Sequence, residues 1–438
     1  MKKIRRGLPA LFVIYILFGF AQASNEYRVL FLESRGMSAT RCGWILAGAG
    51  LLGAISRPLA GAIADKLHSR RIVYILSIIL WIILLALLLL LQQVYIADFL
   101  LCAGIVPLLS ICEPVTYGMI EASGVQATIK YPEIDYSLIR VALSIGYSLI
   151  NFLYTPIINR FGPLAPFGFT LFFVVILLIL SGSLRHFESG TSASMTDYKE
   201  ANASDLKAVN EANINATSTA DHKAARTPSG GSEKLRFDLL FKSYYLIVFV
   251  LLNFILTLGS NTQSYLVFLL NHVELETSLV GVASGIRVVG EIIMMPLIPL
   301  IKRKISLPLL QAIACCFTIV QMVLYITYPV PVIIIGGILL KGLAGGIALG
   351  TTAVYLRMMA PEGLDTTTLS LSTVMMGLGS IVVNLAGGMI IDSGGIMVLY
   401  RCSLIILLAW QLLYFATWFV GVKILKKTPP MPMFLGKG

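Results

Sequence analysis

Apolar runs long enough to cross a lipid bilayer recur along the whole chain, and no other feature restricts its fold as much. An α-helix rises about 1.5 Å per residue, so about 20 apolar residues span the roughly 30 Å of hydrocarbon in a bilayer. Because 57% of the 438 residues are hydrophobic and only 13% are charged, a soluble fold is excluded. Twelve such runs occur, at about 8–32, 43–64, 72–92, 97–121, 136–158, 164–184, 243–270, 277–300, 307–327, 331–357, 367–391 and 397–422. We therefore predict an all-α membrane protein with twelve transmembrane helices.

The basic residues gather in alternate connections between these runs. Lys and Arg accumulate on the cytoplasmic side of membrane proteins, so their distribution predicts orientation. The segments predicted to lie inside carry Lys2, Lys3, Arg5, Arg6, Lys66, Arg70, Arg71, Lys130, Lys302, Arg303, Lys304, Lys423, Lys426 and Lys427, whereas the opposite side has Arg35, Arg41 and Arg160. We expect a multi-pass protein of the plasma membrane with both termini in the cytoplasm. The net charge of +11 is then a topology signal, and no nucleic-acid partner is expected.

Residues 185–240 differ in composition from the rest of the chain. Ser, Thr, Ala, Asn and charged residues dominate there, which is typical of a flexible linker. The segment separates six apolar runs from six. We predict an N-terminal six-helix bundle at 1–184, a flexible cytoplasmic linker at 185–240, a C-terminal six-helix bundle at 241–423 and a cytoplasmic tail at 424–438.

A short pattern repeats between the two sets of six runs. Gly146, Asn151 and Gly162 recur, each 233 positions later, as Gly379, Asn384 and Gly395. Membrane transporters are commonly built from such internal repeats. The repeat therefore favours two pseudo-symmetric six-helix bundles.

The connection after the second run, RPLAGAIADKLHSRR, resembles the signature of the major facilitator superfamily. The resemblance implies a gating motif in which a small glycine lets two helices approach closely and an aspartate at a helix end pairs with basic residues. Its usual glycine after the acidic–basic pair is replaced by His68. The matching residues are Gly61, Asp65, Lys66, Arg70 and Arg71.

Within that superfamily, three short stretches resemble the lactose permease type, which includes oligosaccharide and nucleoside proton symporters and phenylpropionate-permease-like members. These stretches are MIEASG, DYSLIRVALSIGYS and RVVGEIIMMPLIPLIKRK. The resemblance implies substrate binding by Glu121, Arg140, Ser144, Tyr147 and Glu291. The histidine and glutamate that couple protons in the lactose permease are replaced here by Ala344 and Ile347, so another acid must carry the proton.

Ionisable residues deep in a membrane are costly and mark candidate functional positions. Glu291 lies about 18 Å into its run, and Arg287 precedes it by one helical turn on the same face. Lys341 lies about 15 Å deep and could counter Glu291 or Glu113 across a cavity. We expect Arg287 and Lys341 to help bind substrate, and Glu291 or Glu113 to carry the proton.

Two acids compete for the central position of the fourth run. Depth favours Glu113, about 21 Å beyond Phe99, whereas the family pattern favours Glu121. We take Glu121 with Arg140 as the recognition pair, because arginine offers a planar fork of donors. Glu26 and Arg28 are expected near the outer end of the first run, where snorkelling explains them.

No phosphate loop, catalytic triad or metal-ligand spacing is apparent, so neither an enzyme nor a cofactor is expected. The six cysteines are expected to be reduced packing residues. The resulting hypothesis is a monomeric, proton-coupled symporter that takes up a small polar solute such as a sugar, a nucleoside or an aromatic acid. Two alternatives remain open: a proton-driven exporter of amphipathic compounds, and a transporter-like sensor that binds solute without moving it.

Overall fold

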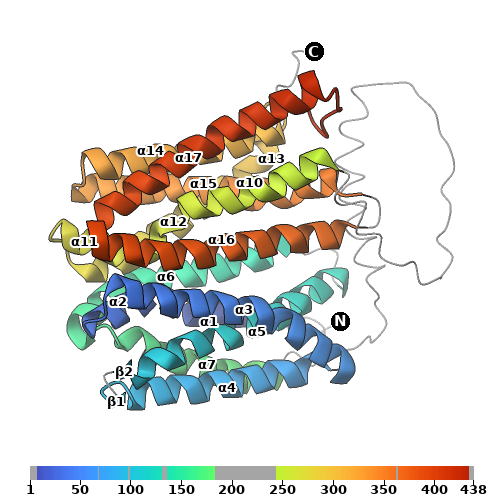
Figure 1. Cartoon of the computed structure of the whole chain (residues 1–438). Coiled ribbons are helices and arrows are strands. Elements are labelled where there is room, and N and C mark those ends of the chain that lie inside the picture. Colours follow the sequence, from blue (N-terminus) through green and yellow to red (C-terminus); the bar gives the residue numbers. More distant parts are fainter. Residues whose placement is uncertain are drawn as a thin grey trace.

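The computed structural model describes residues 7–67, 69–96, 99–130, 136–182, 243–361 and 364–433 of the chain (Figure 1). The predicted linker at 185–240 lies outside the described residues. The described part is a bundle of long helices that run roughly parallel or antiparallel to one another.

The first half of the bundle contains six apolar segments. The first is broken into three pieces, and a short antiparallel hairpin follows the third. The elements are α1 (Gly7–Gln22), η1 (Ala23–Tyr27), α2 (Arg28–Ser34), α3 (Ala39–Leu67), α4 (Arg70–Leu90), β1 (Tyr95–Ile96), β2 (Phe99–Leu100), α5 (Leu101–Lys130), α6 (Tyr136–Phe161) and α7 (Ala165–Leu180).

The second half again contains six apolar segments, and its first one is broken in the same way. The elements are α10 (Tyr244–Ser260), η3 (Thr262–Tyr265), α11 (Leu266–His272), η4 (Thr277–Leu279), α12 (Val280–Met294), η5 (Met295–Leu297), α13 (Ile298–Ile301), α14 (Leu307–Thr327), α15 (Pro331–Met359), α16 (Asp365–Gly394), α17 (Ile396–Phe419) and the π-helical turn η6 (Val420–Ile424).

Within the described residues, eleven helical segments are long and apolar enough to cross a membrane, and α7, at 16 residues, is the shorter twelfth. The predicted count of spans is therefore matched, but two boundaries are wrong. The fourth span begins at Leu101, because the preceding residues form the β1–β2 hairpin, and it continues to Lys130. Glu121 consequently lies inside α5 and not at its end.

The two halves are related by the repeat that the sequence predicts. α6 packs on α1 and α16 packs on α10, the corresponding pair in the other half. Gly146 sits against the backbone of Ile16, and Gly379 sits against Phe254 and Thr257.

The two outer glycines of the repeat are also equivalent. Gly162 and Gly395 follow the ends of α6 and α16, with φ angles of +84° and +82° that residues with a side chain rarely adopt.

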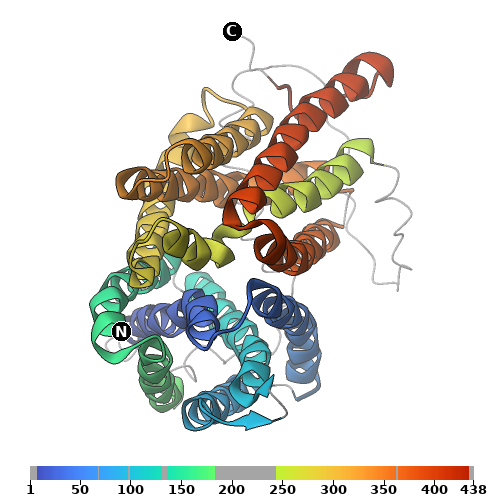
Figure 2. The same cartoon turned by 60° about the vertical axis from the view of Figure 1, so that its left-hand side comes forward.

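The halves form two groups of helices in space, with blue to green elements in one group and yellow to red elements in the other (Figure 2). They touch mainly through α3 against α16 and α6 against α12. The hydrogen bonds between the halves lie toward one end of the molecule, which we call the α2–α11 end. One of them joins Asn271 to Glu33 and another joins Asn159 to Glu276.

Asp392 adds a helix cap to this junction. Its two carboxylate oxygens accept hydrogen bonds from the backbone N–H groups of Ala39 and Thr40, at 3.0 and 2.8 Å. These are the first N–H groups of α3, which have no partner within their own helix and attract negative charge. The end of α16 is therefore fastened to the beginning of α3.

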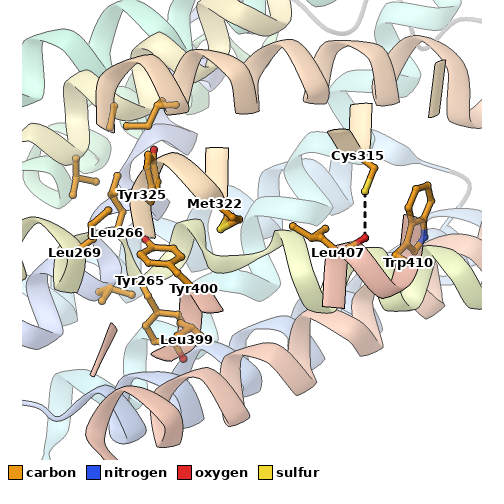
Figure 3. Close-up of a cluster of buried hydrophobic side chains, with 14 of the residues drawn as sticks. Tyr265, Leu266, Leu269, Cys315, Met322, Tyr325, Leu399, Tyr400, Leu407 and Trp410 are labelled. Carbon is orange, nitrogen blue, oxygen red and sulfur yellow. Dashed lines mark hydrogen bonds between the residues drawn. The ribbon is translucent and has the colours of Figure 1, made fainter. Parts of the chain in front are cut away.

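Each half has its own apolar core. In the second half, the rings of Tyr325 and Tyr400 meet edge to face at 5.7 Å, and Cys315 lies near the carbonyl of Leu407 (Figure 3). The cysteines are free, as expected, but Cys316 is exposed at the helix surface and is not a buried packing residue.

Candidate functional site

The break in the first span brings polar side chains to the centre of the bundle. The run Gln22–Ala23–Ser24–Asn25–Glu26–Tyr27–Arg28 interrupts the apolar helix, and η1 turns it so that its polar side chains point to opposite sides. Two cavities of about 420 and 290 Å³ lie beside this break. Both are lined by Gln22, Asn25 and Glu26, so the broken span forms their shared wall.

A buried ion pair lies in the larger cavity. Arg28 donates to Glu113 at 2.8 Å and to the hydroxyl of Ser110 at 2.7 Å. Asn25 donates to the second carboxylate oxygen of Glu113 at 2.6 Å. The side chains of Arg28 and Glu113 are only 9% and 8% exposed, so the snorkelling position predicted for Arg28 is wrong. The chain needs this pairing, because an unpaired charge at such a depth is expensive.

Arg57 and Tyr117 complete one wall of the larger cavity. The guanidinium of Arg57 lies over the Tyr117 ring, 5.5 Å from its centroid, which is cation–π geometry. The Tyr117 hydroxyl donates to Glu121 at 3.3 Å. Glu113, Tyr117 and Glu121 thus follow one another at successive turns of α5.

The smaller cavity is crossed by charges from both halves. Arg287 of α12 pairs with Glu26 of η1 at 3.0 Å and with Glu291, one turn further along its own helix, at 2.9 Å. The Tyr147 hydroxyl donates to Glu26 and lies 3.4 Å from the Arg287 guanidinium. The Arg287–Glu291 contact matches the spacing seen in the sequence, whereas the Glu26 contact between the halves was not foreseen.

The sequence-predicted substrate residues are only partly brought together. Ser144, Tyr147, Arg287 and Glu291 line the smaller cavity. Glu121 and Arg140 line neither of the two cavities, and Glu113 occupies the central place on α5 that depth favoured.

Lys341 does not counter an acid in the way the sequence suggested. Its ammonium donates to the carbonyl of Ser260 at 2.9 Å. Among the described residues it forms no ion pair with Glu291 or Glu113. The predicted charge partner of Lys341 is therefore wrong.

The gating motif lies at the end of the molecule opposite α2 and α11. A Cβ added to Gly61 would meet nothing within 4 Å, so the close helix approach predicted there is absent from this conformation. Lys66 is exposed, and Arg70 and Arg71 begin α4 behind the N-cap Ser69. The side chain of Asp65 lies outside the described residues.

Several cavity residues escaped the sequence analysis. Asn25, Ser110, Arg57, Tyr117 and Asn384 line the larger cavity. The signal available for the first of these was a cluster of polar residues within an apolar run, because such a cluster is costly unless it faces water or partners. Arg57 lay within a motif that drew attention to its other residues. In the part of the chain that the structure describes, no group of His, Cys, Asp and Glu could hold a metal ion.

Two related six-segment halves that enclose polar cavities between them define a polytopic transporter of the major facilitator type. A family model described as the MFS_1 like family matches residues 10–426, so the chain belongs to that family.

Solved structures with the same fold extend this result. The nucleoside transporter NupG aligns with a TM-score of 0.70 and 16% identity, covering 93% of this chain and 97% of that one. A D-xylose-proton symporter aligns with a TM-score of 0.65 and 16% identity, covering 97% and 98%. The peptide transporter POT gives 0.68 and 13%, covering 96% and 95%. No curated protein matches in sequence. At these identities the structures establish the fold alone.

Proposed function

We propose that the protein is a secondary active transporter that couples proton movement to uptake of a small, uncharged polar solute by alternating access. The observation that carries this proposal is a pair of polar cavities, lined by costly buried charges, between two halves of a major facilitator fold. It acts as a monomer in the plasma membrane, without a cofactor, and both termini are cytoplasmic.

The charges of the two cavities favour an uncharged solute. Three acids face three arginines there: Glu26, Glu113 and Glu291 against Arg28, Arg57 and Arg287. The positive surplus that would attract an aromatic carboxylate is thus removed. The remaining polar lining consists of amides and hydroxyls, which bind the hydroxyl groups of sugars and nucleosides.

The proton site is best supported at the Glu26–Arg287–Glu291 cluster. Two carboxylates share one guanidinium there, so the cluster carries a net charge of about −1 when both acids are ionised. One proton makes it neutral and frees one acid from Arg287. Glu113 is the weaker candidate, because Arg28 and Asn25 occupy both of its oxygens.

Protonation at this cluster can act on the conformation because Glu26 and Arg287 belong to different halves. Loss of their pairing removes the innermost of the ionic contacts between the halves. The basic residues assign the α2–α11 end to the outside. With its halves joined at that end, the conformation is one that faces the cytoplasm.

Counterflow in proteoliposomes tests the transport function directly. Vesicles loaded with unlabelled uridine or D-xylose are placed in the labelled compound, and transport predicts transient accumulation without any proton gradient. A sensor binds the compound but gives no counterflow. Vesicles of known orientation separate uptake from export.

Glu291→Gln tests the coupling. The variant should retain counterflow but lose accumulation driven by a pH gradient, because a glutamine cannot exchange the proton. Glu274→Gln, an exposed acid of the α11–η4 connection, is the matched control and should behave as the wild type. Unchanged pH-driven accumulation in Glu291→Gln would refute the proton role.

A further inference from the structure

Each half contains a tyrosine–asparagine pair at the equivalent place. In the first half, the Tyr27 hydroxyl of η1 donates to the side-chain oxygen of Asn151 on α6, at 2.9 Å. In the second half, the Tyr265 hydroxyl of η3 donates to the backbone carbonyl of Asn384 on α16. Asn151 and Asn384 are the matching asparagines of the sequence repeat.

The amide of Asn151 is fully engaged inside the protein. Its oxygen accepts from Tyr27, and its nitrogen donates to the backbone carbonyl of Tyr147 at 2.8 Å. The residue is 0% exposed. Asn151 is therefore a structural residue that joins α6 to the broken first span.

The amide of Asn384 is not engaged in this way. Its side-chain oxygen is buried and has no hydrogen-bond partner, although the residue as a whole is only 6% exposed. Tyr265 uses the backbone carbonyl of Asn384 and leaves the side chain free. A buried polar group without a partner costs free energy comparable to a lost hydrogen bond.

The side chain of Asn384 lines the larger cavity, opposite the Arg28–Glu113 pair. Asn25 lines the same cavity, and its amide oxygen also has no partner. Asn25 comes from the first half and Asn384 from the second. Unpartnered amide groups therefore face one space from both halves of the protein.

We propose that Asn384 is a solute-binding residue that forms a hydrogen bond with a hydroxyl or N–H group of the transported compound. This inference rests on the proposed function, and it adds the contact that ties the solute to the second half of the larger cavity. A solute held by Asn25 and Asn384 together bridges the two halves, so its presence or absence is felt by both.

The repeat supplies a matched pair of variants, Asn384→Ala and Asn151→Ala. Purified wild type and variants are titrated with uridine and with D-xylose by calorimetry, and their melting temperatures are recorded. For a probe that the wild type binds, Asn384→Ala should weaken binding about tenfold, the effect of one lost hydrogen bond with its partner left unpaired, and keep the melting temperature. Asn151→Ala should lower the melting temperature and keep the affinity.

A labelling experiment tests the position of Asn384 without any solute. Asn384→Cys and Asn151→Cys are made in a protein with Cys316→Ser and Cys402→Ser, and treated with a small charged methanethiosulfonate. The cavity position should react and the structural position should not, as read from intact mass.

An unreactive cysteine at position 384 would overturn the proposal. So would wild-type affinity in Asn384→Ala for a probe that binds, or equal losses of affinity in the two alanine variants. Failure of the wild type to bind either probe counts against the proposed solute class, and labelling then decides the assignment of Asn384.

Discussion

Gly281→Ala should open the junction between the halves at the α2–α11 end. Gly281 begins α12 and faces α6 and η1 across the junction. A Cβ there would lie 2.5 Å from the Asn151 carbonyl oxygen, 2.6 Å from the Tyr27 hydroxyl and 2.8 Å from the Thr155 hydroxyl. Side-chain carbons do not approach other atoms so closely, so the two halves must separate or distort.

The expected size follows from what overpacking costs in well-packed proteins. Forcing an extra carbon into such a site costs about 1 to 3 kcal/mol. If the clash exists only while this end is closed, the cost shifts the equilibrium toward the opposite conformation by about 5- to 150-fold. The same shift is expected for Gly43→Ala, because Gly43 faces Tyr265 and Asn384 at the equivalent place.

Distances between spin labels at Arg160 and His272 report this shift. Both residues are exposed, and they belong to different halves at the α2–α11 end. Gly281→Ala should increase the population with the longer distance. Gly61→Ala is the control, since a Cβ at Gly61 meets nothing within 4 Å and the gain in helix propensity is the same. A distance distribution in Gly281→Ala that matches the wild type would refute the reasoning.

Three further predictions concern stability, and thermal denaturation of the purified protein measures each of them. Glu113→Ala should cost about 3 to 5 kcal/mol because it leaves Arg28 buried and unpaired, and a double variant Arg28→Met with Glu113→Leu should cost less; a larger loss in the double variant contradicts this. Lys341→Met should be neutral or stabilising, because the ammonium is held by one carbonyl, and a loss above about 2 kcal/mol would show a charge partner that matters. Gly395→Ala should cost about 1 to 3 kcal/mol at its φ of +82°, whereas Gly168→Ala, within α7 and facing open space, should not destabilise.

The architecture could be predicted from the sequence because the bilayer leaves few solutions. Backbone groups cannot remain unpaired in hydrocarbon, so each apolar run of sufficient length must be a helix. The repeat was visible because the close contacts of Gly146 and Gly379 with neighbouring helices tolerate no side chain. Boundaries were less certain, as the hairpin before Leu101 shows, since apolar residues beside a helix look like helix.

The site was predicted best where it depends on one helix. Arg287 and Glu291 are one turn apart on α12, and helix geometry alone brings them together. Contacts between helices could not be derived in this way. Lys341 lies at a plausible depth, yet its direction around α15 leads to Ser260.

The break in the first span explains the largest error. Glu26 and Arg28 lie near the end of the apolar run when it is counted as a straight helix. The η1 turn changes the direction of the following side chains, so Arg28 reaches Glu113 and Glu26 reaches Arg287. The polar cluster in the sequence indicated a functional segment, but only the three-dimensional structure shows its partners.

Solute-dependent proton movement is the most direct measurement of the proposed coupling. Proteoliposomes that enclose a pH-sensitive dye, with no imposed gradient, receive uridine or D-xylose outside. Wild-type protein should acidify the interior as solute enters, whereas Glu291→Gln should admit labelled solute without acidification. Solute entry with no change of internal pH in the wild type would contradict a proton carried with the solute through the Glu26–Arg287–Glu291 cluster.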